Sequence, residues 1–307
     1  MRVTPGMTAD NAVYNLQQGR VALDSLQEQI ASGSVINRPS DDPLSTRQLL
    51  DLQEQISAGD QYSSNITKAS LLLNVTDTAL TGMSGLMQQV KKIAGDMVSG
   101  TLDASSISGA VTSLTQLKGQ MIDLANTQIG NQYIFAGFKN SQPFDTTTGA
   151  FSGTGDALNL EIANGSTVAT NISGGNLLRG GIPAAAVGSG ATAGGSPVDI
   201  LGSIEALILA ISGQDTAGIV DGAKNMKAAA EQIVAAQTDV AGRLVRLSNM
   251  QSLIDSNQNT LKSIFGDMQN VDYAKVGVQL SQQTTAFNAA LSTTAKLSQL
   301  SLLDYMR

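Results

Sequence analysis

Apolar residues that recur every seven positions constrain the fold of this chain more than any other feature. In the first half, the repeat runs through Leu52, Gly59, Ile66, Leu73, Leu80, Met87 and Ala94. In the second half, alternating steps of four and three residues lead from Met226 to Phe265 and include Gln237, Gln251 and Gln258. A period of 3.5 residues held over this length is typical of helices that pack as coiled coils. We therefore predict two long helices in coiled-coil packing.

Each end of the chain carries a shorter stripe of the same kind. The N-terminal stripe consists of Leu16, Leu23, Leu26 and Ile30, and Gly33 follows it as a helix stop. The heptad pattern breaks at Gly266, and Asp272 can cap a last helix. The C-terminal stripe on that helix consists of Val276, Leu280, Phe287, Ala290 and Leu297. We expect the two ends to lie side by side. Because so few aliphatic residues offset the entropy of ordering these helices, we expect them to become ordered only on assembly.

The middle of the chain changes character. A further helix is expected from about residue 106 to 129, and the stretch YIFAG (Tyr133–Gly137) then begins a region rich in Gly and Thr. Alternating apolar residues on both sides of Asn164-Gly165 predict a β-hairpin with a type I′ turn. The segment from Gly180 to Pro197 is rich in Gly and Ala, which is typical of a flexible linker.

These patterns together predict a mainly α fold with a small β insert. We expect an elongated coiled-coil helical hairpin that carries an outer β domain. Paired terminal helices would occupy residues 1–35 and 272–307, a central helical bundle residues 36–131 and 198–271, and the outer β insert with its linker residues 132–197.

The composition excludes several classes of function. The net charge is −7 with no run of Lys or Arg, whereas a nucleic-acid surface needs clustered cations. The chain has no His and no Cys, so it lacks the commonest general base, the thiol nucleophile and the usual zinc ligands. We expect neither an enzyme nor a cofactor or metal. No apolar stretch reaches the roughly 20 residues of a membrane helix, and the N-terminus shows no apolar region of a secretory signal.

The stretch INRPSDDP, residues 36–43, places two carboxylates between two predicted helices. Asp42 followed by Pro43 is the pattern of a helix cap and a first helical residue. Asp41 adds negative charge near the positive end of the helix dipole. We interpret the stretch as the connection between two helices, with a specific contact in an assembly as its alternative role. Catalysis is not expected there, because no cleft or partner group accompanies the carboxylates.

Four stretches together resemble the flagellin superfamily of bacterial flagella. They are IASGSVINRPSDDP, YIFAG, AGRLVRL (residues 241–247) and AFNAALSTTAKLSQLSLLDYM (residues 286–306). Flagellin itself typically has a lysine and alanines around the paired aspartates, where this chain has Arg38, Pro39 and Pro43. Flagellins also tend to end soon after the SLL motif, whereas Asp304, Tyr305 and Met306 follow it here.

The resemblance implies a structural protein, without chemistry, that joins the hook side of the flagellum to its filament. It implies export through the flagellar type III apparatus without a cleaved signal, and a location outside the cell. The implied partners are further copies of the chain in a ring, a neighbouring hook-associated protein, flagellin and an export chaperone that covers the C-terminal stripe. The implied subunit contacts are Leu16, Leu23, Leu26, Ile30, Arg38, Asp41, Asp42, Val276, Leu280, Phe287, Ala290, Leu297, Leu302 and Leu303.

Three other classes of protein are alternative interpretations of the same sequence. A small flagellin would form the filament itself. A helical-hairpin signalling protein would need an uninterrupted hairpin tip and a membrane anchor, and the sequence shows neither. An enzyme on the β insert would need a Ser–Lys or carboxylate site, which no spacing of residues supports.

Overall fold

The structure, a computed structural model, describes residues 5–100, 103–180 and 197–305. Its helices are α1 (Pro5–Ser32), α2 (Pro43–Ser99), α3 (Ala104–Ala125), α4 (Gly174–Leu178), α5 (Ile200–Ser212), α6 (Thr216–Gln269) and α7 (Tyr273–Tyr305). Its strands are β1 (Gln128–Ile129), β2 (Gln132–Tyr133), β3 (Asn159–Ala163) and β4 (Ser166–Ala169). The prediction of a mainly α fold with a small β insert is confirmed.

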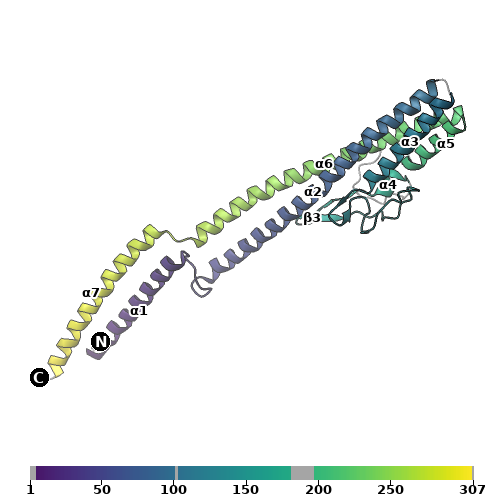
Figure 1. The fold of residues 1–307 in the computed structure, drawn as a ribbon. Helices are drawn as coiled ribbons and strands as arrows, with labels where there is room; N and C mark the ends of the chain where they lie inside the picture. Colours follow the sequence, from purple (N-terminus) through teal and green to yellow (C-terminus); the bar gives the residue numbers. More distant parts are fainter. Residues whose placement is uncertain (1–4, 101–102, 181–196, 306–307) are drawn as a thin grey trace. The chain divides into compact units, whose positions relative to one another are not determined.

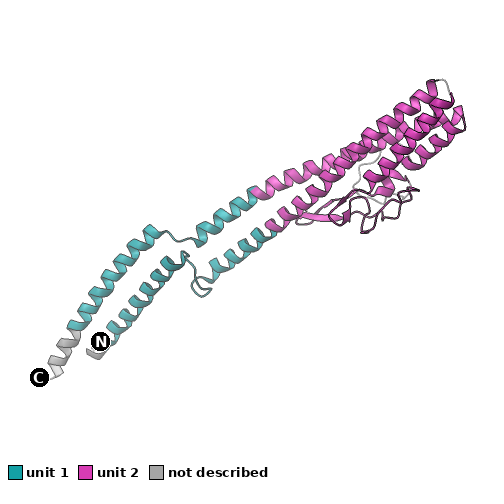
Figure 2. Cartoon of the chain, in the orientation of Figure 1, with its two compact units in different colours: residues 1–58, 256–307 teal, residues 59–255 magenta. Residues whose placement is uncertain are grey.

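The chain forms two compact units (Figure 2). Unit 1 contains residues 1–58 and 256–307, and unit 2 contains residues 59–255. Helices α2 and α6 each contribute one part to unit 1 and another to unit 2. The predicted division into inner, central and outer domains remains a prediction.

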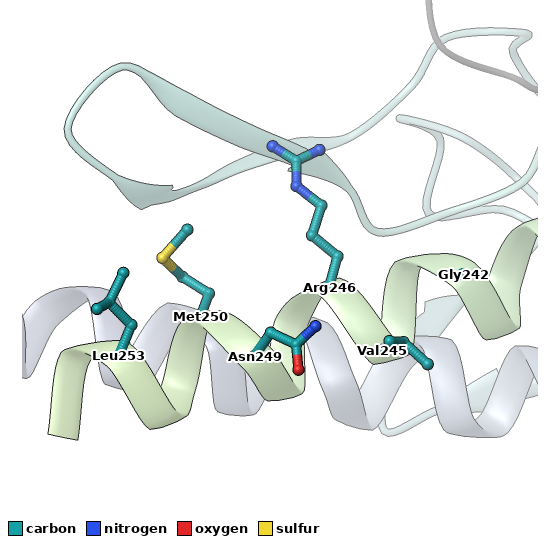
Figure 3. Close-up of a pocket in the computed structure, with 6 residues that line it drawn as sticks. All are labelled: Gly242, Val245, Arg246, Asn249, Met250 and Leu253. Atoms are coloured by element: carbon teal, nitrogen blue, oxygen red, sulfur yellow. The ribbon is translucent and has the colours of Figure 1, made fainter. Parts of the chain in front are cut away.

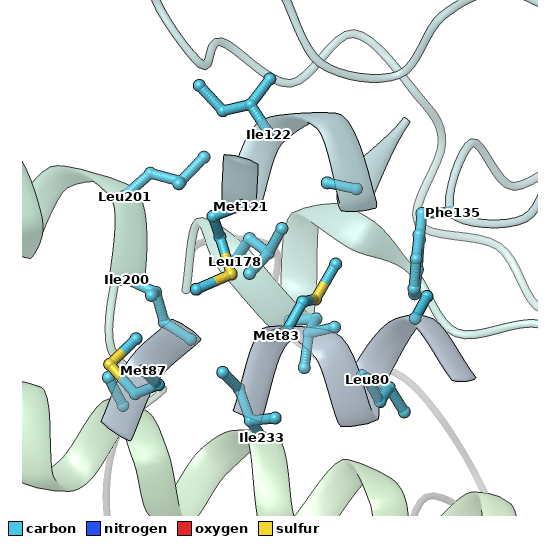
Figure 4. Close-up of a cluster of buried hydrophobic side chains, with 14 of the residues drawn as sticks. Leu80, Met83, Met87, Met121, Ile122, Phe135, Leu178, Ile200, Leu201 and Ile233 are labelled. Atoms are coloured by element: carbon cyan, nitrogen blue, oxygen red, sulfur yellow. The ribbon is translucent and has the colours of Figure 1, made fainter. Parts of the chain in front are cut away.

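The core of unit 2 is built from α2, α3, α5 and α6, with residues of the β insert against them (Figure 4). The sequence repeat explains it, because the heptad positions from Ile66 to Ala94 of α2 are buried. Fully buried side chains from each element fill the centre, among them Leu80, Met83, Met87, Met121, Ile122, Phe135, Leu178, Ile200, Leu201 and Ile233. Methionine is common here because its unbranched side chain fills irregular gaps between helices.

The stripe of α6 alternates buried apolar residues with hydrogen-bonded glutamines, as the sequence predicts. In unit 2, Gln237 donates to the hydroxyl of Thr81 at 3.2 Å, and Gln251 donates to the hydroxyl of Ser63 at 2.9 Å. Leu244 lies between them and packs against the core. Each amide therefore finds a polar partner on α2, and polar layers of this kind specify how two helices align.

Helix α3 is shorter than predicted. Asp103 caps its beginning through a bond from the backbone N–H of Ser106, at 2.9 Å. The helix ends at Ala125 rather than near residue 129, because residues 128–129 pair with residues 132–133 as β1 and β2. The apolar residues of YIFAG then turn inward, and Ile134, Phe135 and Ala136 are buried.

The predicted hairpin is present as the antiparallel pair β3–β4, but its turn is not of type I′. That turn needs a positive φ at both central residues. Gly165 has a φ of 68°, whereas Gln214 is the one non-glycine residue with a positive φ in the described parts of the chain. The pairing register of the two strands shifts between Glu161 and Ala163, so the pairing next to the turn is irregular.

Side chains from two helices hold this hairpin in unit 2. From α6, Arg243 donates to the carbonyl oxygens of Ala169 and Asn171, each at 3.1 Å, and is itself paired with Asp239. From α2, Asn65 donates to the carbonyl oxygen of Glu161 at 2.8 Å. A short hairpin is weakly stable alone, so these bonds fix where it lies.

One side chain of α6 joins two chain segments that are distant in sequence. The amide of Gln232 donates to the carbonyl oxygens of Leu177 at 2.7 Å and Val198 at 3.2 Å. Its oxygen accepts the backbone N–H of Val198 at 2.8 Å. The predicted linker between these segments, apart from its end residues Gly180 and Pro197, lies outside the described residues.

In unit 1, α1 and α7 lie side by side, as predicted for the chain ends (Figure 1). Helix α1 ends at Ser32, where Gly33 has a φ of 73° and donates to the carbonyl oxygen of Gln29 at 2.9 Å. Helix α6 continues past Gly266, where the heptad pattern breaks, and Asn270 donates to the Gly266 carbonyl oxygen at its end. None of the described helices is both long and apolar enough to cross a membrane.

Candidate assembly site

The predicted terminal stripes face each other along α1 and α7. In each helix, one predicted residue is buried: Leu23 in α1, with 9% of its surface exposed, and Val276 in α7, with 7%. The others described are half-buried, namely Leu16, Leu26, Ile30, Leu280, Phe287 and Ala290. The structure thus brings these predicted residues together as a seam within one chain.

The best-defined contact of this seam was missed by the sequence analysis. The ring of Phe287 lies against Gly19, where an added Cβ would come within 3.2 Å of Phe287 Cδ2. Gln283 also donates to the carbonyl oxygen of Gly19, at 3.5 Å. A glycine in the middle of a helix costs stability, so its presence inside the predicted stripe was the available signal.

The remaining predicted leucines lie near the C-terminus. Helix α7 runs to Tyr305 and so includes Leu297, Leu302 and Leu303. The side chains of these three residues lie outside the described part of the structure. Their assignment to a subunit contact stays a prediction.

Asp42 is the helix cap that the sequence predicts. Its Oδ1 accepts the backbone N–H groups of Leu44 and Ser45, both at 3.1 Å, and its Oδ2 accepts the Ser45 hydroxyl at 2.6 Å. The Ser45 hydroxyl, followed by the backbone N–H of Ser45, holds the pKa of Asp42 below its ordinary value. The group is therefore a charged cap at neutral pH, with its acceptor capacity directed into its own helix.

Asp41 and Arg38 shape the loop between α1 and α2. The Oδ2 of Asp41 accepts the backbone N–H of Arg38 at 2.9 Å, and the guanidinium of Arg38 pairs with Glu28 of α1 at 3.2 Å. Asp41 thus closes a turn, which differs from the predicted role beside the helix dipole. Both partners of the ion pair are largely exposed, and such pairs contribute little to stability.

A hollow of about 520 Å³ lies beside this loop. It is lined by residues of α1, the loop, the start of α2 and the end of α6, namely Ser25, Gln29, Val35, Ile36, Asp41, Asp42, Ser45 and Met268. The two carboxylates are the ionisable groups among these residues. A catalytic site would need further groups that convert such a pair into an acid and a base.

A second hollow, of about 350 Å³, lies along α6 in unit 2 (Figure 3). Its lining is largely apolar and includes Val245, Met250 and Leu253. Arg246, which also lines it, points toward the β3–β4 hairpin and donates to the Ser166 hydroxyl at 3.0 Å. Across the described residues, no group of acidic side chains is arranged to hold a metal ion.

Comparison with known proteins gives the class first. Residues 4–140, which include α1, the loop and all of α2 and α3, match the family described as the bacterial flagellin N-terminal helical region. Helix α1 of the seam, together with α2 and α3, therefore lies in the region similar to flagellin.

Curated relatives carry a more specific name. The flagellar hook-associated protein 3 of Salmonella typhimurium is 24% identical over 288 residues, which are 93% of this chain and 82% of that protein. The protein of the same name from Escherichia coli K12 is 28% identical over 137 residues, 44% of this chain and 43% of that protein. The predicted resemblance is confirmed: the chain is similar to flagellar hook-associated protein 3 over most of its length and to flagellin in its N-terminal helical region.

Solved structures support the fold. A structure assigned to a flagellar hook-associated protein of Vibrio parahaemolyticus has a TM-score of 0.63 at 23% identity, and the match covers 75% of this chain and all of that one. The flagellar hook-associated protein 3 of Legionella pneumophila has a TM-score of 0.59 at 13% identity, with 71% and 98% covered. At these identities the likeness concerns the fold alone.

Proposed function

We propose that this protein is the structural adaptor between the hook side of the flagellum and its filament, and that it assembles through the pair of terminal helices. The observation that carries the proposal is the α1–α7 pair, in which few residues are buried within the single chain and of which α1 lies in the flagellin-like region. A long helix pair with so small a core gains stability by covering its other faces. The names of the relatives, hook-associated protein 3, support the place of assembly.

A second apolar stripe on α1 supports contacts between copies. Met7, Tyr14 and Val21 recur every seven residues and are 55%, 60% and 65% exposed. Tyr14 and Val21 each lie two residues before Leu16 and Leu23, which places them on nearly the opposite side of the helix from the stripe that meets α7. We assign this stripe, together with Arg38, Asp41 and Asp42 of the loop, to contacts with neighbouring subunits.

The C-terminal helix has a composition suited to the same role. Between Lys275 and Lys296, α7 contains no charged residue. Most of the outward side chains in this stretch are small or neutral, such as Ala, Ser, Thr and Gln. A surface of this kind can be covered by another copy without desolvating ions.

The partners follow from this assembly. We propose a ring of copies that contacts a hook-associated protein on one side and flagellin on the other, outside the cell. Before assembly, an export chaperone would cover the apolar stripe of α7, including Leu297, Leu302 and Leu303, and the chain would pass through the flagellar type III apparatus. We assign no enzymatic role, since the proposed function needs none.

The test of the place of assembly is a strain that lacks this protein. We expect bare hooks in electron micrographs and flagellin monomers in the medium, because the filament has nothing to attach to. Bare hooks without released flagellin would contradict the adaptor role and indicate that this chain is the filament subunit. Intact flagella in a strain without a second copy of the gene would contradict both roles.

The test of the seam is a pair of charged substitutions. Leu280→Asp and Phe287→Asp should each abolish assembly, because a carboxylate would replace an apolar side chain between α1 and α7. The folding of unit 2, followed by its thermal transition, should stay unchanged. Leu280→Met keeps an apolar side chain of similar volume at the same position and is the matched control. Assembly of Leu280→Asp or Phe287→Asp at the level of this control would show that the seam is assigned wrongly.

A further inference from the structure

The turn of the β3–β4 hairpin consists of Asn164 and Gly165, a pair whose chemical reactivity the proposed function does not use. Asn164 is the only asparagine in the sequence that is followed by a glycine. Both residues are exposed. A Cβ added to Gly165 would meet no atom within 4 Å, so the space beside this residue is open.

The backbone nitrogen of Gly165 has a carboxylate as its partner. Its N–H donates to Oε1 of Glu161 at 3.1 Å. The fold sets this contact, because Glu161 lies on β3, pairs with Thr167 of β4 and accepts a bond from Asn65 of α2 at its own carbonyl oxygen. A carboxylate at this distance from an N–H group is in position to accept its proton.

We propose that Asn164 is a site of spontaneous deamidation and that Glu161 is the catalytic base of this reaction. The nitrogen of Gly165 attacks Cγ of Asn164, the new N–Cγ bond forms, and the Cγ–Nδ2 bond breaks. Glu161 takes the proton of the Gly165 N–H and passes it to Nδ2, which leaves as ammonia. The product is a succinimide ring. Water then opens this ring, which gives aspartate when the ring opens at Cγ and isoaspartate when it opens at the backbone carbonyl.

Two features of the turn favour ring closure. The reacting groups belong to consecutive residues, so the attack is intramolecular, and glycine has no Cβ to hinder the approach or the rotation of the backbone. The shift of register between Glu161 and Ala163 also removes part of the regular strand pairing next to the turn. The backbone at Asn164 is therefore less restrained than it would be in a regular hairpin.

Deamidation would change the hairpin irreversibly. It adds a negative charge to the turn that already holds Glu161, and isoaspartate also adds a methylene carbon to the backbone just before Gly165. Arg246 of α6 points toward this hairpin and donates to the Ser166 hydroxyl at 3.0 Å (Figure 3). The modification thus acts on a contact between the hairpin and α6, and it marks the age of a subunit in its β insert.

The first test uses the full chain, incubated at neutral pH and followed by mass spectrometry of its peptides. Asn164 should convert to a mixture of aspartate and isoaspartate. Asn140, which is exposed and is followed by a serine, is the internal comparison and should convert more slowly. An Asn164 that stays intact as long as Asn140 would overturn the proposal.

A substitution at Glu161 then separates the base from the hydrogen bond. In Glu161→Gln, an acceptor oxygen for the Gly165 N–H remains, but the carboxylate that takes the proton is lost. This variant should deamidate about tenfold or more slowly than the unaltered protein. Glu231→Gln removes the same charge from an exposed position of α6 and should leave the rate unchanged. A rate in Glu161→Gln equal to that of this control, or faster, would overturn the proposal.

Two further measurements distinguish a base from a structural role. Added phosphate buffer, as an external base, should raise the rate of Glu161→Gln more than that of the unaltered protein. In concentrated urea both proteins should deamidate at the same rate, because the hairpin no longer holds Glu161 against the turn. A difference that persists in urea would assign the effect to the local sequence and overturn the proposal. None of these measurements needs assembly, so they are independent of the proposed function.

Discussion

Gln232 offers the sharpest test of how the β insert is attached in unit 2. The substitution Gln232→Ala removes all three hydrogen bonds by which this amide joins the Leu177 and Val198 segments. It leaves helix α6 intact, because alanine is the best helix former. The expected effect is a local loosening of α4 and the beginning of α5, with the four-helix core unchanged.

The magnitude follows from the bonds. A hydrogen bond contributes about 0.5–1.5 kcal/mol to stability, and a backbone group left without a partner in a buried site costs about 1–3 kcal/mol. Gln232 is half-buried, so water can reach part of the vacated site. We therefore expect a loss of about 2 kcal/mol, which for a unit of this size lowers the melting temperature by about 4–8 °C.

Urea unfolding followed by circular dichroism gives the free energy, and hydrogen exchange at the Val198 amide gives the location. Glu231→Ala, at the exposed neighbouring position, is the control and should change the free energy by less than about 0.5 kcal/mol. A Gln232→Ala variant as stable as this control would refute the reasoning. It would mean that packing rather than the amide joins the two segments.

Three further predictions concern other parts of the chain. Gly33→Ala should destabilise unit 1 by about 1 kcal/mol, because Gly33 has a φ of 73°. Gly277→Ala, in an open helical position, should instead stabilise α7 by about 0.5–1 kcal/mol. Urea unfolding measures both changes in free energy and shows whether they have opposite signs. The hydrogen bonds from Ser106 lower the pKa of Asp103, so the contribution of this cap to stability is present above the ordinary carboxyl pKa and is lost as the pH falls below about 4. Asp103→Asn keeps a cap that does not titrate, so this variant should lose less stability between about pH 5 and 3. Equal losses in both proteins would contradict this cause. Met87→Ala, at a fully buried position, should cost about 2–5 kcal/mol by thermal unfolding, whereas Met87→Leu should cost less than about 1.5 kcal/mol, and similar costs would argue against a tightly packed core.

Much of the helical fold could be predicted because each long helix buries apolar residues at the same seven-residue period. The seven-residue period places Ile66, Leu73 and Leu80 on the same side of α2, and all three are buried. The caps were predictable for a similar reason, since an aspartate before Pro43 satisfies N–H groups of the very next turn. Local chemistry of this kind does not depend on what the chain packs against.

The features that escaped prediction depend on contacts between distant residues. Gly19 accommodates the ring of Phe287, and nothing near Gly19 in the sequence indicates an aromatic partner. The hydrogen bond from the Val35 N–H to the Gln269 carbonyl oxygen joins backbone groups, which are alike in nearly all residue types and so leave no pattern in the sequence. The predicted type of the turn at Asn164-Gly165 was wrong because the pairing of β3 with β4 is irregular.

Of the predicted assembly residues, the seam positions are found together within one chain, whereas the loop residues have local partners. Asp42 caps its own helix and Arg38 reaches Glu28 of α1. Contacts with a second copy depend on surfaces that a single chain does not fill. Sequence patterns therefore identify which residues are available for assembly more readily than which residues they meet.

The glutamines of α6 have a consequence for how the two long helices can slide. In unit 2 the order along the stripe is Gln237, Leu244 and Gln251, with hydroxyl partners at both glutamines and none required at the leucine. A slip of seven residues in either direction would preserve the apolar repeat in general, yet it would set Leu244 against a hydroxyl group and move an amide into the leucine's place. Such a slip would break both hydrogen bonds and leave these half-buried glutamines without their hydroxyl partners. The apolar repeat holds the two helices together, and the glutamine bonds favour one alignment among those that the repeat allows.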